Sequence, residues 1–157
     1  MIYNSGSKYE GQWKDNKKHG KGIYYSYNKN NNIGIKYEGE FNNDKFEGKG
    51  IAIYSNGDIY NGEWKNNKQY GKGIVIYKTG GRYEGEWEGG KFNGLGKYFL
   101  SNGERFEGRF SDSKFNGYGK YYFNNSDILE GFFRDEKPIG QCILYKSDGT
   151  VEIKRFI

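Results

Sequence analysis

The sequence predicts an all-β fold, an elongated single-layer antiparallel sheet of successive β-hairpins. The first observation is a five-residue pattern, aromatic-x-Gly-x-aromatic, whose starts fall at residues 37, 60, 83, 106 and 129, a constant step of 23 residues. A fixed period of this size is the signature of a repeat architecture. The second is a Gly-x-Gly eleven residues after each first aromatic, as at Gly20-Lys21-Gly22. The third is composition: 19% aromatic residues, 26 glycines and one proline favour strands and turns over helices.

The aromatic pattern forms the first strand of each repeat. Because side chains alternate along a strand, Tyr9, Gly11 and Trp13 share one face, and Glu10 and Gln12 share an acidic, solvated face. The central glycine leaves a gap that a neighbouring ring can cover. We therefore assign the first-strand aromatics to a structural core: Tyr9, Trp13, Tyr37, Phe41, Tyr60, Trp64, Tyr83, Trp87, Phe106, Phe110 and Phe133.

A turn rich in Lys, Asn, Asp and Gly follows the first strand, and these residue types tolerate positive φ. The second strand is predicted to begin at the Gly-x-Gly and is apolar on both faces. One row is Tyr24, Ala52, Val75, Tyr98, Tyr121 and Leu144. The other row is Tyr25, Ile53, Ile76, Phe99, Tyr122 and Tyr145. One row must join the aromatic face and the other must lie beside the acidic residues, because a single layer cannot cover both faces.

The repeats make up one predicted domain, 1–157. The predicted limits are 9–36, 37–59, 60–82, 83–105, 106–128 and 129–151, with a leading half-repeat at 1–8 and a terminal cap strand at 150–157. The first repeat holds five extra residues, which we place in the polar tract Asn28–Asn32. The last repeat departs from the pattern at Ser126, Leu129 and Cys142, as expected of a terminal cap.

These motifs recur six times in phase over residues 3–151 and resemble the MORN family (membrane occupation and recognition nexus repeats). The resemblance implies a twisted single sheet and a scaffold or adaptor role without catalysis. It also suggests two alternatives, a module that associates with anionic phospholipid membranes and the targeting region of a longer enzyme.

The composition argues against catalytic, metal and cofactor chemistry. His19 is the single histidine and has no repeated base or nucleophile beside it in the pattern. Cys142 is the single cysteine, and a zinc site would need about four Cys or His ligands. A net charge of +5 with interspersed signs disfavours nucleic acid as the ligand. The lone cysteine suits a reducing compartment, so we expect a cytoplasmic location, next to a membrane or the cytoskeleton.

The second apolar row provides the expected binding surface, an exposed aromatic groove. Its predicted residues are Tyr25, Ile53, Ile76, Phe99, Tyr122 and Tyr145, and its expected occupant is an amphipathic helix or an extended peptide of a protein partner. The terminal strands are also expected to allow homodimers through edge pairing. For the lipid alternative, the contact residues are Lys17, Lys18, Lys65 and Lys68, which lie in two basic loops.

Overall fold

The computed structural model describes residues 6–27 and 32–157, and those ranges contain strands and turns without a helix. Most of the predicted leading half-repeat and of the inserted tract thus lies outside the described residues. Two compact parts are distinguished: an N-terminal module of residues 1–78 with 88–90, and a C-terminal module of residues 79–87 with 91–157.

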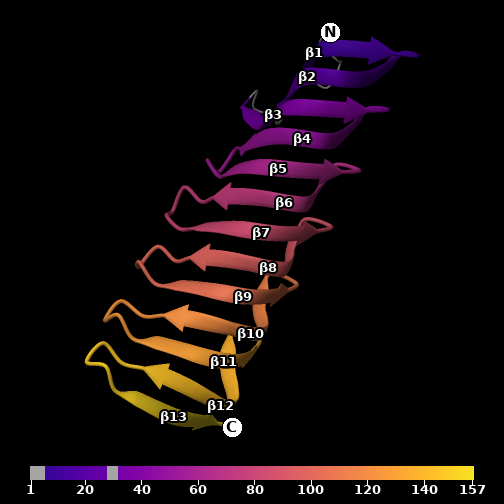
Figure 1. Cartoon of the computed structure of the whole chain (residues 1–157). Coiled ribbons are helices and arrows are strands. Elements are labelled where there is room, and N and C mark those ends of the chain that lie inside the picture. Colours follow the sequence, from indigo (N-terminus) through magenta and orange to yellow (C-terminus); the bar gives the residue numbers. More distant parts are fainter. Residues whose placement is uncertain (1–5, 28–31) are drawn as a thin grey trace. The chain divides into compact units, whose positions relative to one another are not determined.

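Each module consists of antiparallel strands that follow one another in chain order (Figure 1). The N-terminal module contains β1 (Lys8–Lys14), β2 (Lys17–Tyr27), β3 (Ile33–Asn42), β4 (Lys45–Tyr54), β5 (Ile59–Lys65) and β6 (Lys68–Ile76). The C-terminal module contains β7 (Arg82–Glu88), β8 (Lys91–Phe99), β9 (Arg105–Ser111), β10 (Lys114–Tyr122), β11 (Ile128–Arg134), β12 (Lys137–Tyr145) and β13 (Val151–Phe156). The prediction of an all-β chain of successive antiparallel hairpins is confirmed.

The hairpin turn within each repeat is shorter than predicted, because it consists of two residues that both have positive φ. The pairs are Asp15-Asn16, Asn43-Asp44, Asn66-Asn67, Gly89-Gly90, Asp112-Ser113 and Asp135-Glu136. Two positive φ angles match the twist of the flanking strands. The second strand consequently begins three residues before the Gly-x-Gly, at Lys45 in β4 for example. It continues through Gly48, whose φ is 61°, close to a register shift in the pairing with β3.

In each module the core lies on one face of the sheet and is built from stacked rings. In the second repeat, the Phe46 ring stacks on Tyr37 with centroids 3.8 Å apart. Trp64, from the next repeat, packs edge-on against both rings at 5.2 and 5.5 Å. The C-terminal module repeats this arrangement with Phe92 on Tyr83 and with Phe110 edge-on to both. Each repeat therefore needs a ring from the next one to complete its core.

The glycine pair lies under the first tyrosine of its own repeat, where we had predicted a neighbouring ring. The Tyr37 hydroxyl donates a hydrogen bond to the Glu40 carbonyl at 2.9 Å, so the ring lies along its own strand. A Cβ added to Gly39 would be 2.5 Å from the Gly50 Cα and 2.6 Å from the Tyr37 hydroxyl oxygen. Glycine is thus required by close approach of both backbone and ring.

The last repeat replaces this arrangement with a smaller pair of side chains. Leu129 stands where the other repeats have Tyr or Phe, and Cys142 stands where they have the second glycine. Both side chains are buried, and a Cβ added to Gly131 would clash with the Cys142 sulfur. Burial raises the pKa of the Cys142 thiol. The cysteine thus fills the space that the shorter leucine leaves.

The predicted core residues are buried with one exception. The buried ones are Tyr9, Tyr37, Phe41, Tyr60, Trp64, Tyr83, Trp87, Phe106, Phe110 and Phe133. Trp13, however, is 40% exposed, so its core assignment is corrected. Phe41 packs on Tyr9 of the repeat before it, whereas the ring contact of Trp13 within the described residues is with Tyr9 of its own repeat.

Candidate interaction surface

The two apolar rows of the second strands lie on opposite faces. In the first row, Ala52 and Val75 are buried and pair across the strands with Tyr37 and Tyr60, so this row joins the aromatic core. The second row lies on the other side, which we call the open face. Its residues are exposed (Ile53, Ile76, Tyr145) or half-buried (Tyr25, Phe99, Tyr122).

On the N-terminal module the open face is rich in isoleucine. Besides Ile53 and Ile76, the side chains of Ile51, Ile59 and Ile74 are 43%, 37% and 39% exposed. These three were missed in the sequence reasoning, which assigned to the binding surface only one residue from each second strand. The signal was present, because Ile51 and Ile74 lie two residues before Ile53 and Ile76 and so point to the same side of the strand.

A shallow groove crosses β1 to β5 on this face. Backbone of the paired glycines lines it. One side carries isoleucines alternating with carboxylates, and the other carries lysines beside Glu40. The side chains that define its chemistry are Ile23, Ile51, Glu10, Glu38, Lys21 and Lys49.

The two glutamates on the isoleucine side have lysine partners. Lys8 forms an ion pair with Glu10, which lowers the pKa of the Glu10 carboxyl and raises that of Lys8. The Lys36 ammonium lies 3.4 Å from the Glu38 carboxylate.

In the first four repeats, the fourth residue of the aromatic pattern has a structural role that sequence reasoning missed. Glu40 accepts a hydrogen bond from the Lys49 backbone N–H at 3.2 Å, and Glu63 accepts one from the Lys72 N–H at 3.1 Å. Gln12 does the same for the Lys21 N–H at 3.0 Å. These side chains satisfy backbone donors beside the positive-φ glycine, so they are more than a solvated acidic row.

The lysines that donate these backbone N–H groups have side chains that extend into solvent. Lys21, Lys49 and Lys72 are exposed, and their ammonium groups make no ion pair within 4 Å in the described part of the chain. The equivalent residues of the C-terminal module are uncharged: Leu95, Tyr118 and Gln141.

On the open face of the C-terminal module, basic side chains form ion pairs with glutamates. Lys97 lies 3.5 Å from Glu107, and Lys120 lies 3.1 Å from Glu130. Arg105 also contacts Glu107 at 2.9 Å. Its guanidinium lies 3.8 Å from the centroid of the Tyr122 ring, so one predicted groove residue is partly covered.

A second predicted groove residue is covered in the same way, since the Arg82 guanidinium lies 4.2 Å from the centroid of Phe99. Exposed apolar side chains on this module are therefore found further along the strands. They include Leu95, Tyr118 and Phe132, of which the last two rings are in contact at 5.3 Å.

Two of the four lysines predicted for lipid contact lie over aromatic rings. The Lys18 ammonium is 4.9 Å from the centroid of Tyr24, and the Lys65 ammonium is 4.8 Å from that of Tyr70. Lys17 and Lys68 are exposed at the hairpin edge. The four residues belong to two separate hairpins rather than to one cluster.

The described residues contain no group of three or more His, Cys, Asp or Glu side chains placed to hold a metal ion. Within these ranges there is also no helix of the length and hydropathy needed to cross a membrane. His19 is half-buried on β2.

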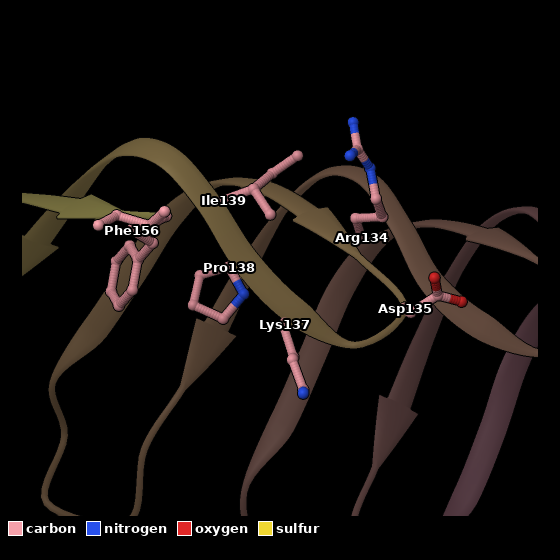
Figure 2. A pocket seen from close by; sticks show the side chains of 7 residues that line it. Arg134, Asp135, Lys137, Pro138, Ile139 and Phe156 are labelled. Carbon is pink, nitrogen blue, oxygen red and sulfur yellow. The ribbon is translucent and has the colours of Figure 1, made fainter.

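At the end of the C-terminal module, β13 keeps one aromatic of the repeat, which sequence reasoning missed. Phe156 lies 23 residues after Phe133, in the fifth position of a first strand formed by β13. It borders a pocket with Pro138 and Ile139, where Pro138 stands at the position of the stacking Phe46 (Figure 2). The first and third positions of the pattern are Glu152 and Lys154 rather than an aromatic residue and glycine, which hid this relation.

Comparison with protein families identifies the repeat. No curated protein matches the chain as a relative. Among solved structures, the chain is similar to the SAS-4 (dCPAP) TCP domain of Drosophila melanogaster, solved in complex with a proline-rich motif of Ana2 (dSTIL). That similarity has 14% identity and a TM-score of 0.49, and covers 99% of this chain and 88% of the other. The MORN repeat model matches residues 9–30, 37–59, 60–82, 83–105 and 106–128. These segments make up more than half of the chain, which therefore belongs to the MORN repeat family.

Proposed function

We propose that the chain is a non-catalytic protein-interaction module, a scaffold or adaptor, that binds a segment of its partner on the open face of the N-terminal module. The observation that carries the proposal is the cluster of five isoleucines on this face, at positions 51, 53, 59, 74 and 76, each 37–51% exposed. A contiguous apolar surface on a polar chain usually marks a binding site.

The face that carries the aromatic core, which we call the inner face, supports this use of the open face. Its rings pack on one another and on the glycine pairs, so a partner can cover the isoleucines without disturbing the core. The groove is also already formed in the free chain, and a preformed surface reduces the ordering cost of binding.

A charge-reversal experiment separates this proposal from the lipid alternative. If Lys17, Lys18, Lys65 and Lys68 carry the function, the chain should bind anionic vesicles at low salt. Binding should then fall steeply by about 0.15 M salt, where the screening length is about 8 Å. Changing the four lysines to Glu should abolish that binding, whereas it should leave protein binding on the isoleucine face intact.

The direct test replaces Ile51, Ile53, Ile74 and Ile76 with Thr, which keeps β-branching but removes apolar surface. The matched control changes Leu95, Tyr118 and Phe132, exposed at 57%, 49% and 56%, to Thr. We expect proteins that the wild-type chain enriches from cell extract to be lost with the isoleucine variant and retained with the control. Equal enrichment by both variants would contradict the proposal.

A further inference from the structure

We propose that the segment bound by the N-terminal module is an acidic polyproline-II strand that carries a carboxylate at every third residue and crosses β2, β4 and β6. This inference rests on the proposed function and specifies the conformation and charge of the partner. It follows from the pitch of the repeat and from the lysines of the open face that have no ion-pair partner.

The pitch comes from the sheet. Lys21, Lys49 and Lys72 occupy the same position on the second strands of three successive repeats, with one first strand between each pair. Neighbouring strands are about 4.8 Å apart, so equivalent residues recur about every 9.6 Å across the module. A partner that makes the same contact with each repeat must present equivalent groups at this interval.

A polyproline-II strand has this interval. It has three residues per turn and a rise of about 3.1 Å per residue, so every third side chain points the same way after about 9.3 Å. The mismatch with the sheet is about 0.3 Å per repeat when compared with the strand spacing. Over the two intervals from Lys21 to Lys72 it stays below the tolerance of a flexible lysine side chain.

The other regular conformations fit less well. In an α-helix the first same-facing residue of comparable distance is seven positions on, about 10.5 Å away, so the error is about 0.9 Å per repeat. In a β-strand same-facing residues recur about every 6.6 Å, which is not commensurate with the sheet.

The charges of the groove indicate what the third residue is. Glu10 and Glu38 already have Lys8 and Lys36 as partners, and Glu40 accepts a backbone N–H. Glu63 is occupied in the same way. The ammonium groups of Lys21, Lys49 and Lys72 have no ion-pair partner within 4 Å among the described residues. A carboxylate on the partner is therefore the complementary group.

The isoleucines indicate the second residue of each turn. Ile23, Ile51 and Ile74 stand two residues after these lysines on the same strands and on the same face, and they share the same pitch. An apolar side chain in each turn of the partner would cover them. Proline suits the third place, because it fixes φ near −65° and lowers the entropy lost on binding.

The test uses a labelled peptide of four Glu-Ile-Pro triplets, titrated with the full chain at about 0.1 M salt and followed by fluorescence anisotropy. One control is an isomer of the same composition whose glutamates are two or four residues apart. A second control is a helical peptide with Glu and Ile at heptad spacing. We expect the triplet peptide to bind at least about tenfold more tightly than either control, if three ion pairs each contribute as surface pairs do.

The lysine variant Lys21→Gln, Lys49→Gln, Lys72→Gln should weaken triplet binding by about tenfold, since three such pairs are lost. The variant Lys14→Gln, Lys17→Gln, Lys68→Gln removes the same charge from exposed positions at the hairpin edge and should leave binding unchanged. Equal binding of triplet and isomer, tighter binding of the helix, or equal effects of the two lysine variants would overturn the inference.

Failure of this inference can be told from failure of the proposed function. If the triplet peptide does not bind but the isoleucine variant still loses the enriched proteins, the binding face stands and the polyproline-II partner is wrong. If the isoleucine variant also retains those proteins, the proposed function is wrong as well.

Discussion

The open faces of the two modules have the same backbone pattern but different chemistry. Ile51 and Ile74 in the N-terminal module correspond to Lys97 and Lys120 in the C-terminal module, and these lysines pair with Glu107 and Glu130. The same strand position thus carries exposed isoleucines in one module and ion-paired lysines in the other.

The difference shows which residues the fold constrains. The inner face needs its rings and glycines, because each repeat is completed by the next, and both modules keep them outside the last repeat. The open face does not require particular rings or glycines for packing, so its side chains can vary while the sheet is kept. Binding specificity in a repeat chain of this kind is therefore carried by the positions that depart from the repeat.

The largest expected effect tests whether the inner faces are equivalent. Trp64→Ala in the N-terminal module and Phe110→Ala in the C-terminal module should each lower the free energy of unfolding by about 3–5 kcal/mol, because both rings are buried between repeats. Trp13→Ala should cost clearly less, since its indole is 40% exposed. Urea denaturation of the three variants measures this, and equal losses for Trp13 and Trp64 would argue against stability supplied by neighbouring repeats.

The next effect is alkaline destabilisation. Burial raises the pKa of Tyr37, Tyr60 and Tyr83, and it raises that of Tyr54 to about 12. An unfolded tyrosine titrates near pH 10, so the stabilisation is complete below pH 10 and is lost as the pH rises toward 12. Denaturation measured from pH 8 to 12 should show this fall.

A phenylalanine variant is the control for the alkaline effect. The double change Tyr37→Phe and Tyr60→Phe should flatten the pH dependence. In the C-terminal module the same repeat position holds Tyr83, Phe106 and Leu129, of which only Tyr83 can titrate. An unchanged pH profile in the double variant would show that other groups cause the alkaline loss.

A smaller effect concerns the tyrosine hydroxyl. Tyr37→Phe removes the hydrogen bond to the Glu40 carbonyl and should cost about 0.5–1.5 kcal/mol. The reverse change, Phe106→Tyr, places a hydroxyl near the equivalent carbonyl of Arg109 and should be neutral or slightly stabilising. Thermal unfolding of both variants checks the pair, and destabilisation by both would mean that the two modules hold this ring differently.

The smallest effect on stability is expected when one open face is converted into the other. Lys97→Ile and Lys120→Ile remove two exposed ion pairs and should change the free energy of unfolding by less than about 1 kcal/mol. The same double variant should bind apolar peptides on the C-terminal module, which hydrogen exchange with and without peptide would detect. Binding that stays confined to the N-terminal module would show that side chains other than those at positions 97 and 120 determine where the peptide binds.

Much of the fold could be predicted from the sequence because the same pattern of aromatic residues and glycines recurs in each repeat. The interval between Tyr37, Tyr60 and Tyr83 predicts the hairpins, and pairs such as Asn66-Asn67 predict turns with positive φ. The alternation of strand residues also divides the second strand into two rows. It does not say which row faces the core, however.

Only the tertiary structure decided that choice, along with the chemistry of the open face. A β-bulge near Gly39 and Glu40 shifts the register within the repeat by two residues, from the pair Gly39–Gly50 to the pair Glu40–Glu47. The residue opposite a given position therefore cannot be found by counting from the turn alone.

The sequence by itself determined the repeat, the strands and the turns, since these depend on local spacing and on glycine positions. Contacts between strands decided the rest. The hydrogen bond that Glu40 accepts and the ion pair of Lys120 with Glu130 each depend on a partner from another strand. The period alone does not specify that partner, because it gives the order of the strands but not the side chains that meet across them.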